Sequence, residues 1–308
     1  MKSIVTLLAL ALAATELFGA PAGVPTKVLS FNPPDSVSFT AMTVTARSRV
    51  VDTLPPIVDS TYISTDYTIA RRADGFLVTG KQVSTNYSRD GKKIENDISR
   101  ISSNITVTTE LNKSGLATSV SGYEALFARI DSLPDKSTVD ALKQVFSPQA
   151  LSSRDINEWN GKMSHVVDKA LKLGFDRHDT TSMSVGEGKT LKFYSVAEFT
   201  DTTRVNGQLR LRVRIVSDTD PVELADNLQK SAAVIGKLFS LPDSLLKPSP
   251  SSAGYHSLTE LVVDAETLLF LRETQHREVI APVMTKDGRS VLSRMTETLD
   301  KRFEYAKK

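Results

Sequence analysis

Three arginines alternate with apolar residues in one short stretch, Leu209-Arg210-Leu211-Arg212-Val213-Arg214-Ile215. This alternation predicts a strand with two different faces, because successive side chains of a strand point to opposite sides of its sheet. One face then carries Arg210, Arg212 and Arg214. A row of guanidinium groups can attract an anionic partner or a lipid headgroup, but an ordinary solvated sheet face also presents such a row.

The expected hairpin partner of this strand distinguishes the two interpretations. Asn206-Gly207 directly precedes the arginine stretch, so the partner strand is expected within Phe193–Thr203. A two-residue turn would place Phe199 opposite Arg214, whereas a three-residue loop places Glu198 opposite the same arginine. The second register separates polar from apolar side chains. We therefore predict the three-residue loop and interpret the arginine row as a solvated face.

The apolar face of the hairpin must be buried against helices, a second sheet or a lipid. We expect this face, together with apolar residues of the closing strands, to bind a hydrophobic ligand or a lipidated partner. The alternative is a structural or protein-interaction module of the bacterial envelope without a small-molecule ligand, in which the three arginines contact an anionic partner. The expected ligand-binding residues are Phe193, Phe199, Leu209, Leu211, Val213, Ile215, Val263 and Phe270.

Two further segments match chemical motifs only in part. Gly186–Thr190, GEGKT, resembles the end of a phosphate-binding loop, but Met183 stands where that loop requires glycine, and a strand-like segment follows. We interpret it as a turn before a strand. Asp176–Asp179, DRHD, gathers two carboxylates and a histidine, but the four histidines of the chain lack metal-site spacing. We interpret it as a polar loop.

Composition also argues against several functions. Lysine and arginine exceed aspartate and glutamate by only 38 to 36, whereas nucleic-acid binding needs a concentrated basic face. Sugar clefts use aromatic platforms, and Trp159 is the single tryptophan. No G-x-S-x-G nucleophile motif occurs. We therefore expect a binding protein that is not an enzyme, with no cofactor, no metal and no nucleic-acid partner.

The N-terminus indicates export. Lys2 precedes an apolar run from Ile4 to Ala14, and the small residues Ala20-Pro21-Ala22 follow. This order is typical of a secretory signal peptide, here residues 1–22. The run is shorter than the about 20 apolar residues of a membrane span, so we expect no transmembrane segment in the mature chain. The absence of cysteine excludes disulfides and a lipidated cysteine. We expect a periplasmic or secreted protein.

The hydrophobic pattern predicts strands, then helices, then strands. Alternating residues between Ser36 and Val120 predict strands, with Asp74-Gly75 and Asp90-Gly91 as hairpin turns. Along the first strand the apolar phase changes, which predicts a β-bulge near Ala41. Helical spacing covers Tyr123–Ile130, Val139–Phe146 and a stretch from Ser147-Pro148 to about Leu171. Further strands are expected from Leu191 onward, and between them a helix begins at Asp220-Pro221, with Asp220 as its N-cap.

Two segments resemble known families. Leu258–Val279, LTELVVDAETLLFLRETQHREV, resembles the strand–turn–strand of periplasmic half-barrel proteins, the lipoprotein carriers and receptors of the bacterial envelope, in which a strand ends in Asp and turns over a Thr. Ile105–Ile130 resembles uncharacterised secreted bacterial β-rich families. The first resemblance implies a curved sheet around helices, with an apolar concave cavity for acyl chains. This chain differs by its helical middle and by lacking the receptors' lipidated cysteine, so no functional residue is carried over.

Together these patterns predict the α+β class, with a mainly antiparallel, curved, half-barrel-like sheet and inserted helices. Residues 23–308 are expected to form a single domain. The alternative is two β-rich halves, about 23–122 and 190–308, joined by the helical middle.

Overall fold

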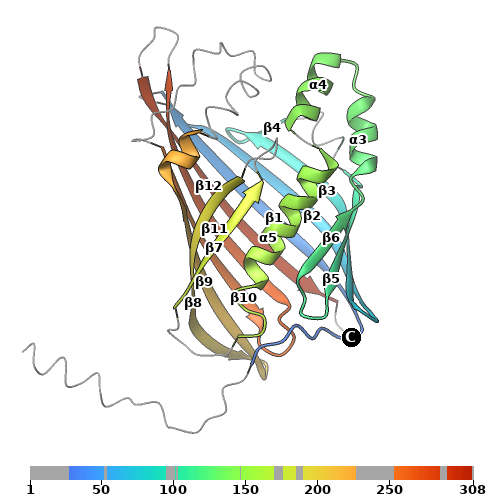
Figure 1. Cartoon of the computed structure of the whole chain (residues 1–308). Coiled ribbons are helices and arrows are strands. Elements are labelled where there is room, and N and C mark those ends of the chain that lie inside the picture. The colour runs from blue at the N-terminus through green and yellow to red at the C-terminus, as the bar shows by residue number, and fades with distance from the viewer. Residues whose placement is uncertain are drawn as a thin grey trace, which may run out of the picture.

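The computed structural model describes residues 28–51, 54–94, 101, 103–145, 147–169, 176–184, 190–226, 253–284 and 290–306. These residues form one antiparallel sheet of twelve strands, together with helices α3, α4 and α5 (Figure 1). The expected signal peptide, 1–22, and residues 186–189 of the GEGKT turn lie outside the described residues. No helix of the described part is long and apolar enough to cross a membrane.

The elements follow one another in the expected order of strands, helices and strands. The strands are β1 (Ser36–Val51), β2 (Ile57–Arg72), β3 (Gly75–Arg89), β4 (Lys92–Lys93), β5 (Thr106–Asn112), β6 (Ala117–Ser121), β7 (Asp176–Ser184), β8 (Thr190–Val205), β9 (Gln208–Thr219), β10 (Gly254–Asp264), β11 (Phe270–Met284) and β12 (Ser290–Tyr305). The helices are α3 (Glu124–Asp131), α4 (Lys136–Val145) and α5 (Pro148–Met163).

The first and last strands lie at the centre of the sheet. The strand order is β6-β5-β3-β2-β1-β12-β11-β10-β9-β8-β7, and β4 pairs with β3. β1 pairs with β12 from Phe39 opposite Tyr305 to Val51 opposite Ser293. The two β-rich regions therefore belong to one sheet. This sheet curves strongly but stays open, with β6 and β7 as its edges (Figure 1).

Helix α5 lies on the concave side of the sheet, between the two edge strands (Figure 1). Its side chains bind the backbone near edge strand β6. The Asn160 amide accepts a hydrogen bond from the Ala117 N–H (2.7 Å) and donates one to the Ala117 carbonyl (3.0 Å). The Trp159 indole N–H donates to the Gly115 carbonyl (2.8 Å). The helix thus satisfies backbone groups that an uncovered edge would leave unpaired.

The helix starts agree with the sequence prediction, but one helix end does not. Ser147 caps α5 by accepting a hydrogen bond from the Ala150 N–H (3.0 Å), and Pro148 is the first helical residue. The helix ends at Met163 and not near Leu171. Beyond it the chain bends back: the Asp168 N–H donates to the Leu29 carbonyl (2.7 Å), which replaces the continuation of the helix.

A capped turn also begins the short helical segment at residues 221–226. The Asp220 carboxylate accepts hydrogen bonds from the Val222 N–H (2.8 Å) and the Glu223 N–H (3.0 Å), as predicted. The segment resembling the half-barrel carriers also forms the expected turn between β10 and β11. There the Asp264 carboxylate accepts hydrogen bonds from the Thr267 N–H (2.8 Å) and its hydroxyl (2.9 Å).

The β8–β9 hairpin combines the two registers considered from the sequence. The predicted three-residue loop is wrong, because Val205 pairs directly with Gln208 across a two-residue turn at Asn206-Gly207. Both turn residues have positive φ, 52° and 82°, as the preferred hairpin turn requires. A register shift between Phe199 and Asp201 then restores the predicted pairing of Glu198 with Arg214. Beyond this β-bulge, Phe199 lies opposite Val213 and Ala197 opposite Ile215, as predicted.

Two other local predictions are wrong. The bulge expected near Ala41 is absent, since β1 pairs with β12 and with β2 without a register shift. The apolar residues change face because the concave side itself changes from apolar at Val37 and Phe39 to polar at Thr43 and Thr45. The DRHD segment is not a loop, because Asp176–Asp179 begins strand β7.

Candidate functional site

The concave face of β8, β9 and β10 is filled by the protein's own side chains. Leu211, Val213 and Val263 are fully buried and belong to one cluster with Met163 and Val166 from the end of α5 and the turn after it. These side chains therefore form part of the protein core.

The other half of the concave face encloses a cavity of about 550 Å³. It lies between the helices and strands β1, β2, β3, β5, β11 and β12. Its floor is aromatic: Phe39 stacks on Tyr67 at 5.1 Å between ring centroids, and Trp159 meets Phe270 edge-on at 5.6 Å. The floor is completed by Phe31, Phe303 and Tyr305.

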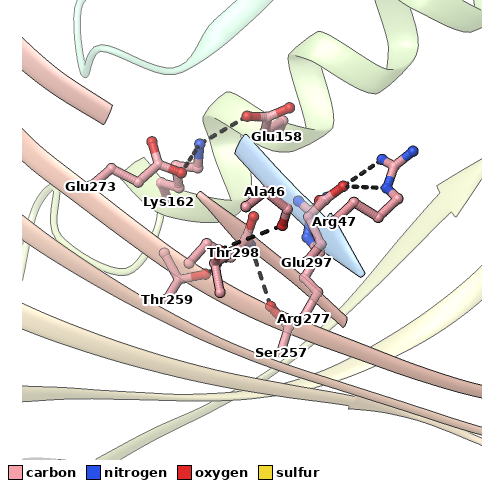
Figure 2. A network of polar contacts seen from close by, with 11 residues as sticks. Ala46, Arg47, Glu158, Lys162, Ser257, Thr259, Glu273, Arg277, Glu297 and Thr298 are labelled. Atoms are coloured by element: carbon pink, nitrogen blue, oxygen red, sulfur yellow. Dashed lines mark hydrogen bonds and ion pairs between the residues drawn. The ribbon is translucent and has the colours of Figure 1, made fainter. Parts of the chain in front are cut away.

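A buried ion-pair group borders this floor. Lys162 of α5 binds Glu273 of β11 (2.7 Å) and Glu158, one helical turn earlier (2.9 Å), as Figure 2 shows. Glu273 is 3% exposed and Lys162 is 13% exposed, whereas 49% of the Glu158 side chain meets solvent inside the cavity. The Lys162 ammonium lowers the pKa of Glu158 to about 2. Burial opposes the charge of Lys162, but the two carboxylates raise its pKa above the ordinary value.

Two other cations line the cavity. Arg154 pairs with Asp155 (3.1 Å), and Asp155 also accepts a short hydrogen bond from the Tyr123 hydroxyl. Burial, together with the negative charge of Asp155, raises the pKa of Tyr123. Lys301 of β12 places its ammonium over the rings of Tyr67 (5.6 Å) and Phe303 (5.2 Å). The aromatic floor and the charged groups therefore meet at Lys301.

A row of alternating charge crosses five neighbouring strands beyond the cavity. Arg277, Glu297, Arg47, Asp59 and Arg89 occupy successive register positions on β11, β12, β1, β2 and β3. Glu297 binds both Arg47 (3.0 Å from Nε) and Arg277 (3.3 Å), and Asp59 binds Arg89 (2.8 Å). Burial raises the pKa of Asp59, but hydrogen bonds from Arg89 and Tyr87, together with the positive charges of Arg89 and Arg47, lower it to a greater extent. We call this row the charge ladder; part of it appears in Figure 2.

The ion pair of Glu158 makes the stability of the fold depend on pH. A carboxylate whose pKa is depressed in the folded state stabilises the fold above its unfolded pKa of about 4.3, and this contribution is lost as pH falls toward the folded value. We expect the Glu158→Gln variant to be less stable than the wild type at neutral pH. The difference should shrink as pH falls from about 5 toward 2. Urea unfolding of both proteins at several pH values measures it.

Glu124→Gln provides the control, because Glu124 is an exposed residue in the first turn of α3. The difference in free energy of unfolding between this variant and the wild type should stay nearly constant over the same pH range. A Glu158→Gln difference that stays constant or widens as pH falls would contradict the assigned ion pair.

The structure separates the predicted ligand-binding residues. Phe270 lines the cavity. Among the others, Leu209 packs half-buried against the core cluster, and Phe193 contacts the Tyr255 ring at 5.2 Å in a separate cluster. The remaining five are buried in the core cluster: Phe199, Leu211, Val213, Ile215 and Val263.

The three arginines of β9 point to the convex side of the sheet. Arg212 and Arg214 are exposed and Arg210 is half-buried. Arg214 lies opposite Glu198 on β8 and Glu260 on β10. This mixed-charge surface has the character of a solvated sheet face, and contact with an anionic partner stays a prediction.

Sequence analysis overlooked the charged groups of the concave face. Lys162 and Glu158 have helical i,i+4 spacing, but such pairs are common on solvated helix faces. A better signal was present in β12, where both alternating sets of residues carry charges, for example Lys301 and Arg302. A strand with polar residues at both odd and even positions indicates a sheet whose two faces both contact solvent in part.

Comparison with known proteins does not assign a family. No family model matches the chain, and no curated protein matches it. Similar solved structures include DynF from the dynemicin biosynthesis pathway of Micromonospora chersina, with 8% identity over 94% of this chain and 91% of that chain (TM-score 0.22). OpdQ of Pseudomonas aeruginosa has 7% identity over 89% and 100% (TM-score 0.24), and a loop-deletion mutant of the Vibrio cholerae outer membrane protein OmpT has 6% over 88% and 100% (TM-score 0.20). These scores support no more than a general β-rich likeness.

Within the described residues, no group of three or more His, Asp or Glu side chains could hold a metal ion.

Proposed function

We propose that this protein is an exported, non-catalytic binding protein, in which the curved sheet acts as a half-barrel that holds a hydrophobic ligand or the lipid part of a partner. The observation that supports this proposal is the cavity of about 550 Å³ with its aromatic floor. Its volume is within the range of about 300–1,000 Å³ usual for small-ligand sites. The proposed site lies over β1–β3 and β12 and shares Phe270 with the residues expected from the sequence.

A cavity-filling substitution tests the proposal. Thr65 of β2 lines the cavity, and Thr65→Trp would fill part of it with an indole ring. The probe is 11-(dansylamino)undecanoic acid, whose fluorescence rises in an apolar site. We expect the wild type to bind it and Thr65→Trp to bind it about tenfold or more weakly, a loss of about 1.4 kcal/mol.

Thr68→Trp is the matched control, because Thr68 is an exposed residue of the same strand on the opposite face of the sheet. It should bind the probe as the wild type does. Equal loss of binding in both variants, or no binding by the wild type, would contradict the proposed site. Native mass spectrometry of protein purified from its own host, followed by organic extraction, would identify a co-purifying ligand.

A further inference from the structure

One cation beside the ion-pair group has no carboxylate partner among the described residues. The ion-pair group and the part of the charge ladder that Glu297 joins contain the cations Lys162, Arg277 and Arg47 and the carboxylates of Glu158, Glu273 and Glu297. These six charges balance. Lys301 adds a further cation on the same face, at the border of the aromatic floor.

Lys301 contacts aromatic rings and forms no ion pair with a described carboxylate, unlike Lys162. Directly across the β11–β12 pair lies Glu273, but that carboxylate is held by Lys162 at 2.7 Å. Lys301 instead lies over two aromatic rings, and among the described residues no carboxylate forms an ion pair with it. Ring faces compensate an ammonium only in part, by about 0.5–2 kcal/mol. An anion brought by a ligand would therefore gain a charge-assisted hydrogen bond there.

The solvent-exposed side chains of the charge ladder are also mainly positive. The side chains of Arg47, Arg89 and Arg277 are 52%, 49% and 37% exposed, whereas those of Glu297 and Asp59 are 11% and 25% exposed. Guanidinium groups thus dominate the accessible part of the ladder, and this favours the approach of an anion.

We infer that the ligand of the cavity is an amphiphile with one anionic headgroup, a carboxylate or a similar oxyanion, which pairs with the Lys301 ammonium while its apolar part lies on the aromatic floor. This inference rests on the proposed function and adds the charge of the ligand to it. A monoanion would give Lys301 the negatively charged partner that it lacks, whereas a cation would place a second positive charge beside it. The carboxylate of Glu158 interacts with Lys162 at 2.9 Å, and its electrostatic interaction with Lys301 is weaker than that with Lys162.

Two probes that differ in charge and by one methyl group test the inference: 11-(dansylamino)undecanoic acid and its uncharged methyl ester. For the wild type we expect the acid to bind about tenfold or more tightly than the ester, as one charge-assisted hydrogen bond would give. Lys301→Met should remove this preference while leaving ester affinity within about twofold, because the aromatic floor is unchanged. Lys301→Arg, which keeps the charge, should retain most of the preference.

Arg302→Met serves as the control, because Arg302 is the next residue of β12, carries the same charge, and is 63% exposed on the opposite face. It should leave both affinities unchanged. Equal affinity of the wild type for acid and ester would overturn the inference and leave the proposed function intact. Equal loss of both probes in Lys301→Met would show a merely structural role for Lys301. If the wild type binds neither probe, the proposed function itself fails.

Discussion

Replacement of Lys162 by methionine is expected to destabilise the protein by about 3–5 kcal/mol, the usual cost of removing one partner from a buried ion pair. Lys162 is the cation that holds the carboxylate of Glu273, a residue only 3% exposed. Without it, Glu273 loses the cation that it binds, and Lys301, directly across the β11–β12 pair, remains as a neighbouring positive charge. The loss should therefore be largest at neutral pH and smaller in acid. Urea unfolding at two pH values measures both effects.

A double-mutant cycle shows whether the loss of stability comes from the Glu273 carboxylate without its Lys162 partner. The double variant Lys162→Met/Glu273→Gln removes both charges and should recover a large part of the stability, with a coupling energy of about 1–3 kcal/mol. Lys143→Met is the matched control, because the ion pair of Lys143 with Asp131 is about half exposed on both sides. It should cost at most about 1 kcal/mol. Equal losses in the two lysine variants would contradict the buried ion pair.

Replacement of Gly75 by alanine is expected to destabilise the protein by about 3 kcal/mol or more. Gly75 has φ +152°, and a Cβ atom there would lie 1.9 Å from the Leu111 carbonyl oxygen of the neighbouring strand. The obstacle is backbone of β5 and not a flexible side chain. The sheet must therefore separate locally to accept the methyl group.

Gly91→Ala provides the comparison, because Gly91 also follows an aspartate in a hairpin turn. Its φ is +77°, but no atom lies within 4 Å of the position of an added Cβ. Only the backbone preference opposes the change, at a cost of about 1 kcal/mol. The free energies of unfolding of the two variants, measured with urea, should differ by about 2 kcal/mol or more. Similar losses would mean that Gly75 is not as tightly packed as described.

Local sequence signals predicted local structure well. Asp90-Gly91 is a hairpin turn as predicted, and Asp74-Gly75 marked the β2–β3 hairpin, although its turn is Ala73-Asp74 and Gly75 already pairs with Arg72. The caps at Ser147 and Asp220 marked two helix starts. Each signal depends on the conformation of a few adjacent residues. The sequence nevertheless could not distinguish Gly75 from Gly91, since the difference between them is the β5 backbone beside Gly75.

The candidate site was much less predictable, because it depends on residues that are far apart in the chain. Lys162 and Glu273 come from a helix and a strand separated by more than a hundred positions, and the charge ladder draws one residue from each of five strands. The change of phase in β1 was a visible sign of a concave face that is apolar at one end and polar at the other. A bulge near Ala41 was the local explanation for it, and the structure has none there.

The central pairing of β1 with β12 also determines when the protein can fold. Phe39 finds its partner Tyr305 only at the far end of the chain, and contacts this distant in sequence slow folding because a very long loop must close first. Until the sixteen residues of β12 have been synthesised, β1 and β11 each lack one neighbouring strand. The part of the sheet from β6 to β1 cannot then join the part from β11 to β7. The complete sheet therefore forms only after a segment more than two hundred residues beyond β1 has been made.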